Sequence, residues 1–391
     1  MARFSVQHGR WSLAALAGVW VVTAVVLGGN PEPAANRNGA AAPSGGPNAD
    51  APPAWSAESV DKAARTLPRL YSLLISRRGE LIFERYYGGA RRDRPANIKS
   101  ASKSVISALI GIAVDRGLVP GVKAPIVTYF PELGRDPDAR KREITVEHLL
   151  TMRPGLEGTS NRNYGAWVTS RHWVRHALAR PMFAAPGEEM EYSTGNTHLL
   201  SAILTKATGK STLRFANEVL AKPLGFTLAP WPRDPQGIYF GGNDMLMTPR
   251  QMLAFGELYL NEGRLNGQQV VSERWVRQSC EGRARDRRPG NPAFDPNGGV
   301  DPMRDRRYGY LWWVHEIGDY ETCFAWGYGG QYVFILPELD LVLVTTSSPD
   351  VSDERRGHRR VVFDILERLV VAPVAGERLS ARRVSEEPAT D

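Results

Sequence analysis

The sequence predicts an α/β (α+β) domain in which an antiparallel sheet is flanked by helices and carries an all-α insertion. Two β-rich runs near the start, residues 71–75 and 81–86, are joined by Arg77-Arg78-Gly79, which is a hairpin signal. Residues 145–276 are mostly helical and loop-like in pattern. Further β-rich runs return only near the C-terminal end, at 322–326, 331–336 and 341–345. Strands at both ends around a helical middle are typical of one sheet interrupted by an insertion.

Two helices are expected beside this sheet. Residues 103–117 place Ile106, Leu109, Ile110 and Ala113 at helical spacing, so we expect a mostly apolar helix there. Residues 359–371 form an amphipathic pattern that predicts a closing helix.

The composition is that of a globular protein. Of 391 residues, 42% are apolar and 23% charged, which excludes a disordered or collagen-like chain. The net charge of +7 comes mostly from arginine. Acidic residues interrupt most of the basic clusters, and no nucleic-acid motif accompanies them, so we expect a solvated basic surface and no nucleic-acid partner.

The chain has two cysteines, Cys280 and Cys323. Two are too few for a disulfide framework or a tetrahedral zinc site. Export would permit one disulfide, but nothing in the sequence brings the two together, so we expect two unpaired thiols. His172 and His176 are four residues apart with no evident third ligand, so we expect no metal and no cofactor.

The N-terminal region predicts export. No charged residue occurs between Trp11 and Pro31, and Arg3 and Arg10 precede this apolar stretch. Its length lies between those of a signal peptide and a membrane span. We expect residues 1–29 to be a signal peptide or, with slight preference, an uncleaved membrane anchor. The remainder would then face the periplasm or the extracellular side, or be released there if the segment is cleaved.

Composition also divides the rest of the chain. Residues 30–53 are rich in Ala, Pro, Gly and Asn and predict a disordered linker. We expect the folded domain at 54–373, followed by a charged flexible tail at 374–391.

The motif with the most chemical content is Ser100-Ala101-Ser102-Lys103, at the start of the predicted apolar helix. Positions i and i+3 share a helix face, so Lys103 can lie against the Ser100 hydroxyl. A serine needs a base to become a nucleophile. Burial disfavours the ammonium form of lysine and can supply that base as a neutral amine. Helix N-terminal N–H groups would also favour negative charge beside Ser100.

This motif is short enough to occur by chance. Ser59-Val60-Asp61-Lys62 has the same spacing, but it begins a polar helix, so we interpret it as a cap and a solvated face. The same structural interpretation applies to Ser100 and Lys103 unless their helix is buried.

Two further segments could complete a hydrolytic site. In Tyr192-Ser193-Thr194-Gly195-Asn196, a tyrosine near a lysine could lose its proton more easily and pass it to a leaving group. The alternative is a buried structural tyrosine. The glycine-rich residues 325–331 lie between two predicted strands, where a backbone N–H could complete an oxyanion hole with that of Ser100. The alternative there is an ordinary turn or bulge.

Taken in order, Ser100-x-x-Lys103, Tyr192 and the glycine-rich strand before Pro337-Glu-Leu-Asp340 resemble the class C β-lactamase-type serine hydrolase family. This family includes class C β-lactamases, D-alanyl-D-alanine carboxypeptidases, related esterases and 6-aminohexanoate-dimer hydrolases. The resemblance extends over residues 71–371 and is supported by the segments 144–152, 242–250, 258–267 and 308–313.

The resemblance implies a β-lactamase/D,D-peptidase-like fold and a metal-free acyl-enzyme mechanism. Ser100 would be the nucleophile, with Lys103 and Tyr192 as the proton-transfer pair. The backbone N–H groups of Ser100 and Tyr328 would form the oxyanion hole. Five more residues are expected at the substrate site: Trp167, Thr194, Asn196, Trp313 and Trp326.

Two departures from the β-lactamase pattern favour the esterase and amidase branch. Thr194 replaces the asparagine of Tyr-x-Asn, and Ala325 replaces the lysine of the Lys-Thr-Gly strand. We therefore expect a hydrolase of small esters or amides, similar to a 6-aminohexanoate-dimer hydrolase or a carboxylesterase. The alternatives are a β-lactamase or D-alanyl-D-alanine carboxypeptidase, and a non-catalytic penicillin-binding sensor. The oligomeric state is not predicted.

Overall fold

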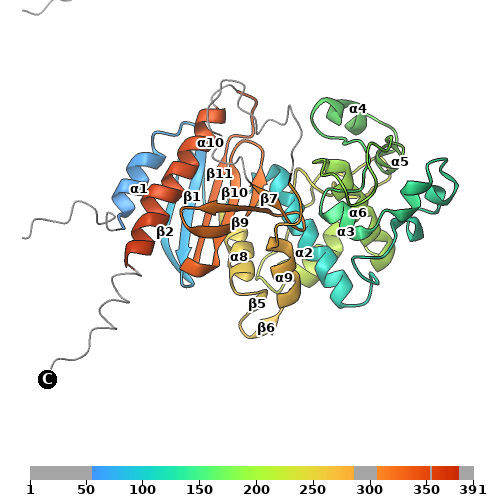
Figure 1. Cartoon of the computed structure of the whole chain (residues 1–391). Coiled ribbons are helices and arrows are strands. Elements are labelled where there is room, and N and C mark those ends of the chain that lie inside the picture. The colour runs from blue at the N-terminus through green and yellow to red at the C-terminus, as the bar shows by residue number, and fades with distance from the viewer. Residues whose placement is uncertain (1–54, 286–305, 353–354, 378–391) are drawn as a thin grey trace, which may run out of the picture. The chain divides into compact units, whose positions relative to one another are not determined.

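A seven-stranded antiparallel sheet dominates the computed structural model, which describes residues 55–285, 306–352 and 355–377 (Figure 1). The strand order is β2-β1-β11-β10-β9-β8-β7, so β1 pairs directly with the last strand, β11, and β2 forms the edge beside β1. The strands are β1 (Leu70–Arg77), β2 (Glu80–Tyr86), β7 (Arg307–Tyr308), β8 (Trp313–Ile317), β9 (Tyr320–Gly327), β10 (Gln331–Leu336) and β11 (Leu341–Ser347).

The predicted hairpin forms between β1 and β2. Arg77 pairs with Glu80, and the two residues between them, Arg78 and Gly79, both have positive φ angles, +53° and +77°. This is the turn geometry whose twist matches that of paired strands. The three C-terminal strands expected from the sequence, β9, β10 and β11, also form and pair in chain order.

Strand β11 is buried along its whole length because helices cover both of its faces. Helix α8 (Pro249–Leu260) packs against β1, β10 and β11 on one face, where Gly256 lies against Val342. Helices α1 (Ala57–Ala64) and α10 (Arg355–Asp364) lie against the other face (Figure 1).

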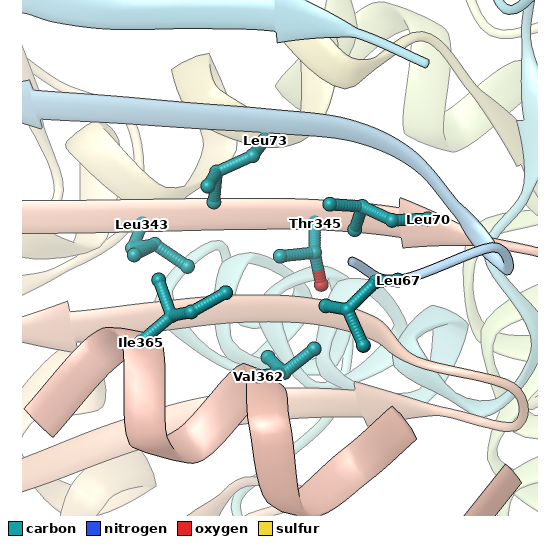
Figure 2. A pocket seen from close by; sticks show the side chains of 7 residues that line it. All are labelled: Leu67, Leu70, Leu73, Leu343, Thr345, Val362 and Ile365. Atoms are coloured by element: carbon teal, nitrogen blue, oxygen red, sulfur yellow. The ribbon is translucent and has the colours of Figure 1, made fainter. Parts of the chain in front are cut away.

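A small apolar cavity lies under α10, as Figure 2 shows. It is lined by Leu67, Leu70, Leu73, Leu343, Thr345, Val362 and Ile365. None of these residues is a candidate catalytic residue, so the cavity belongs to the core packing between sheet and helix.

The predicted closing helix is longer than expected. After α10 the chain continues as a π-helical segment, Ile365–Val371, and stays helical through residue 377. Val374 is buried, so helical, packed structure continues beyond residue 373, where the sequence suggested that the domain ends.

Helix α2 (Ser102–Asp115) joins the sheet to the expected all-α insertion. It contacts β9 on one side and α6 on the other, and every residue from Ser102 to Ala113 is buried. The insertion helices are α3 (Val146–Leu150), α4 (Tyr164–Val168), α5 (Trp173–Leu178), α6 (Thr194–Thr208) and α7 (Thr212–Ala216). The remaining elements are β3 (Ala96–Asn97), β4 (Leu246–Met247), β5 (Arg264–Leu265), β6 (Gln268–Gln269) and α9 (Glu273–Cys280).

The expectation of two unpaired thiols is wrong. Cys280, the last residue of α9, forms a disulfide with Cys323 in β9. The two residues are 43 positions apart, and only the packing of α9 beside the sheet brings them together.

The N-terminal segment 1–29, the linker 30–53 and tail residues 378–391 lie outside the described residues. Among the helices that the structure does describe, none has the length and apolar character needed to cross a membrane.

Candidate active site

Ser100 and Lys103 meet at the buried start of α2. Ser100 lies in a 3₁₀ turn, Lys99–Ala101, that leads directly into the helix. Lys103 follows on the first turn of α2, and only 1% of its surface is exposed. Its Nζ lies 3.1 Å from Ser100 Oγ, so the structural alternative of a surface lysine does not hold.

The other contacts of Lys103 leave the lone pair of its neutral amine available to the Ser100 hydroxyl. Nζ donates to the carbonyl oxygen of Gly242 at 2.6 Å and to Thr194 Oγ1 at 3.2 Å. A neutral amine has two N–H groups and one lone pair. With both N–H groups engaged, the lone pair is left for the proton of the Ser100 hydroxyl.

Burial lowers the pKa of Lys103 to about 7, against the opposing effect of the Asp244 carboxylate, which raises it. A substantial fraction of Lys103 is therefore the neutral amine near pH 7, and this fraction grows as the pH rises. A buried lysine of this kind is a competent general base near neutral pH.

Tyr192 lies in the loop before α6, next to both Ser100 and Lys103. Its phenol hydrogen-bonds Ser100, and Lys103 Nζ lies 5.0 Å from the centre of its ring, over the ring face. Burial raises the pKa of the Tyr192 phenol above its usual value of 10. The expectation that this tyrosine loses its proton more easily is therefore wrong in direction. Tyr192 remains a neutral hydroxyl and can donate or relay a proton.

The glycine-rich end of β9 approaches the nucleophile through its backbone. A Cβ on Gly327 would lie 2.1 Å from the carbonyl oxygen of Ile98, so only glycine permits this approach. Gly329 and Gly330 follow with φ angles of +90° and +110°, which turn the chain back into β10. Tyr328, the residue after Gly327, therefore lies on the turn that follows the strand packed against the Ser100 segment.

Three of the five expected substrate-site residues lie around this centre. Thr194 contacts Lys103, as described above. Trp313 stacks on Tyr192 with ring centres 5.8 Å apart, and Trp326 lies 5.7 Å from Trp313. The two tryptophans and the tyrosine therefore form one continuous aromatic cluster.

The other two have their contacts with core residues of the insertion. Trp167 is fully buried among Trp173, His198 and Phe240, and its Nε1 donates to the Trp173 carbonyl. Asn196 is 3% exposed and donates its amide to the sulfur of Met152. Both side chains are therefore part of the core of the insertion.

Several residues of the site were not singled out from the sequence. Gly242 and Asp244 lie in a segment quoted only for its resemblance, and Ser160, which hydrogen-bonds Thr194, had no distinguishing signal. Two guanidinium groups flank Trp326, those of Arg306 at 5.6 Å and Arg359 at 5.7 Å. Trp326 directly follows Ala325, the strand position at which the β-lactamase pattern has a lysine.

Within the described residues, no three His, Cys, Asp or Glu side chains are grouped so that they could hold a metal ion. The chemistry available at this centre is that of a hydroxyl nucleophile, a buried amine and a neutral phenol. A site of this composition places the protein among the serine hydrolases that use a lysine rather than a histidine as base.

Comparison with known proteins agrees with this class. The Beta-lactamase family model matches residues 69–367, and the chain belongs to that family. It is 25% identical to the 6-aminohexanoate-dimer hydrolase of Paenarthrobacter ureafaciens over 379 residues, which cover 90% of this chain and 88% of that protein.

Solved structures with the same fold include two further proteins. Simvastatin synthase from Aspergillus terreus has a TM-score of 0.63 at 17% identity, covering 82% of this chain and 99% of that one. EstCE1, described as a hydrolase with promiscuous acyltransferase activity, has a TM-score of 0.60 at 16% identity, covering 78% and 97%. The predicted β-lactamase/D,D-peptidase-like fold is confirmed, and the protein is a serine hydrolase of the Beta-lactamase family.

Proposed function

We propose that the protein hydrolyses small neutral esters or amides through an acyl-enzyme formed on Ser100. The observation that carries this proposal is the 3.1 Å approach of Lys103 Nζ to Ser100 Oγ in a lysine that is almost completely buried. Neither group would have this arrangement if the motif served only to cap a helix.

In the first half-reaction, neutral Lys103 accepts the Ser100 proton as Oγ attacks the substrate carbonyl. The N–H groups of Ser100 and Tyr328 stabilise the resulting oxyanion. The C–O or C–N bond then breaks, and the proton held by Lys103 reaches the leaving group through the Tyr192 hydroxyl. The products are an alcohol or amine and the Ser100 ester.

In the second half-reaction, a water molecule takes the place of the leaving group. Its proton passes by the same route to Lys103 while its oxygen attacks the acyl carbon. Collapse of the second tetrahedral intermediate returns the proton to Ser100 and releases the carboxylic acid.

The surroundings of Ser100 favour neutral, partly apolar substrates. Ala325 is buried and supplies no charge, and the side chains nearby are the aromatic rings of Tyr192, Trp313 and Trp326. The two arginines beside these rings, Arg306 and Arg359, are stacked against the tryptophans. The Paenarthrobacter relative is named as a hydrolase of the 6-aminohexanoate dimer. This name supports an amide with a flexible aliphatic chain as one candidate substrate.

A direct comparison of kcat/KM for a short-chain p-nitrophenyl ester and for nitrocefin tests the substrate class. The missing strand lysine removes a charge-assisted hydrogen bond worth about 1.5–3 kcal/mol, which corresponds to roughly one to two decades in rate. We expect the ester to be the better substrate. If nitrocefin is turned over more efficiently, the β-lactamase alternative replaces this proposal, and Arg306 and Arg359 are the cations to examine. Covalent labelling of Ser100 without turnover of any ester or amide would instead favour the penicillin-binding sensor.

We further propose that the domain works outside the cytoplasm, held by an uncleaved N-terminal anchor or released after cleavage. The disulfide between Cys280 and Cys323 supports export, because such bonds persist in oxidising compartments. A fusion of residues 1–53 to a phosphatase that folds only where its own disulfides form tests this. Phosphatase activity is expected with residues 1–53 and not with residues 30–53; an inactive 1–53 fusion would contradict export.

A further inference from the structure

An ion pair joins the residue before the nucleophile to the segment that contacts the general base. Lys99 Nζ lies 2.9 Å from Asp244 Oδ1, and Asn97 Nδ2 donates to the same oxygen at 2.8 Å. Lys99 immediately precedes Ser100. Asp244 lies two positions after Gly242, and the Gly242 carbonyl accepts a hydrogen bond from Lys103.

Both members of this pair hold an uncommon backbone conformation. Lys99 has φ +49° and Asp244 has φ +61°, in the left-handed region that is unfavourable for side-chain-bearing residues. Lysine has no local reason to occupy this region, whereas aspartate tolerates it better. The Lys99 conformation is therefore held by its contacts, which include the ion pair with Asp244 and the hydrogen bond from its N–H to Asn97 Oδ1.

The two segments are also joined through their backbones. Ile98 N donates to Met245 O at 3.0 Å, and Asn97 pairs with Leu246 between β3 and β4. Ser102 Oγ donates to Lys99 O and accepts from Met245 N. The position of the Gly242 carbonyl relative to Lys103 is thus fixed by the same contacts that shape the Ser100 turn.

We propose that Lys99 and Asp244 are positioning residues that hold the Ser100 turn against the Gly242 segment and balance the charge beside Lys103. The proposal rests on the function assigned to Lys103 above. Asp244 is the carboxylate whose field acts on Lys103, and Lys99 is its cationic partner. Removing either partner should change how readily Lys103 holds a proton, in opposite directions.

The other groups around Lys103 do not supply a competing charge. Tyr192 lies against it and Tyr308 lies beside Tyr192, and burial raises the pKa of both phenols, so both stay neutral. Arg306 is stacked over Trp313, with its guanidinium 4.9 Å from the ring centre. His198 on α6 is paired with Asp234 in a fully buried contact. Lys99 and Asp244 are each about four-fifths buried, so water screens their charges only in part.

The pH dependence of kcat/KM for a p-nitrophenyl ester provides the test. The wild-type acid limb should have its midpoint near pH 7, where Lys103 loses its proton. Lys99→Met leaves Asp244 uncompensated, which favours the ammonium form of Lys103, so the midpoint should move up by roughly 0.5–1 pH unit. Asp244→Asn keeps a residue that tolerates positive φ but removes the negative charge, so the midpoint should move down by a similar amount. The double variant should return close to the wild-type midpoint.

Two controls separate charge from strain. Lys99→Gly removes the same charge as Lys99→Met while accepting positive φ, so it should show the same upward shift with less loss of stability. Lys210→Met breaks a similar pair with Glu218, 2.6 Å apart and outside the site, and should leave the midpoint unchanged.

Labelling of the mapped serine by a fluorophosphonate, measured across the same pH range, separates the two proposals. If Ser100 is labelled and the Lys99 and Asp244 variants fold but keep the wild-type midpoint, or both shift it in one direction, the positioning proposal is wrong and the catalytic assignment stands. If Ser100 is not labelled at all, the catalytic assignment itself fails.

Discussion

The chain contains the same four-residue spacing twice, and the two copies have different surroundings. Ser59 and Lys62 lie on α1, with both side chains exposed at the edge of the domain. Ser100 and Lys103 lie at the start of α2, a helix buried from Ser102 to Ala113 between the sheet and the insertion. In the first pair the serine and lysine are solvated side chains of an amphipathic helix. In the second, burial changes the chemistry of the lysine.

The burial of the helix that carries the motif, and not the spacing of the motif, decides whether its lysine can act as a base. Spacing alone brings a hydroxyl and an amine to one helix face in both places. Only α2 removes water from the amine, and this loss of hydration lowers the pKa of Lys103 to about 7. Ser59 is not even the helix cap, since Ser56 accepts the hydrogen bond from the Ser59 N–H.

The largest expected difference between the two copies is in the serines. Ser100→Ala should reduce kcat for p-nitrophenyl ester hydrolysis by at least about 10⁴-fold, because no acyl-enzyme can form. Ser59→Ala should leave kcat and KM unchanged, and both variants can be assayed side by side. An inactive Ser59→Ala enzyme with an active Ser100→Ala enzyme would reverse the assignment.

The two lysines should differ by a smaller factor. Lys103→Met keeps the apolar stem in its buried position but removes the base, so kcat/KM at pH 8 should fall by about 10²–10⁴-fold. Lys62→Met should have no effect on the rate. Circular dichroism of both variants checks that the fold is retained, and a fully active Lys103→Met enzyme would remove lysine from the mechanism.

The sequence could predict contacts within one element but not contacts between distant ones. Ser100 and Lys103 were predictable because a single helix sets their separation. The hairpin at Arg78-Gly79 and the strands β9 to β11 were predictable for the same local reason. Tyr192 and the Tyr328 turn required the resemblance, since neither is close to Ser100 in the chain.

Other features depend on packing that the sequence pattern does not specify. Lys99 and Asp244 are 145 positions apart and meet through the register of β3 and β4. Trp167 was expected to border the cleft, but the aromatic pattern around it cannot show which side faces the core. The pairing of Cys280 with Cys323 likewise follows from where α9 packs.

The smallest expected effect concerns the stability of α1, the helix that carries Ser59 and Lys62. Ser56→Ala removes the N-cap of α1 and should lower the free energy of unfolding by about 1 kcal/mol. Catalytic parameters should not change, because α1 lies on the face of the sheet opposite α8. Urea denaturation of Ser56→Ala beside the wild type measures this, and a loss of activity without a loss of stability would show that α1 contributes to the site.

Peptide mapping of the protein after reaction with a fluorophosphonate tests the central claim most directly. The reagent reports a serine whose hydroxyl is activated, whatever the natural substrate is. The account predicts one modified residue, Ser100, and much slower modification in the Lys103→Met variant. Modification of Ser59 or another serine, with Ser100 unmodified, would contradict it.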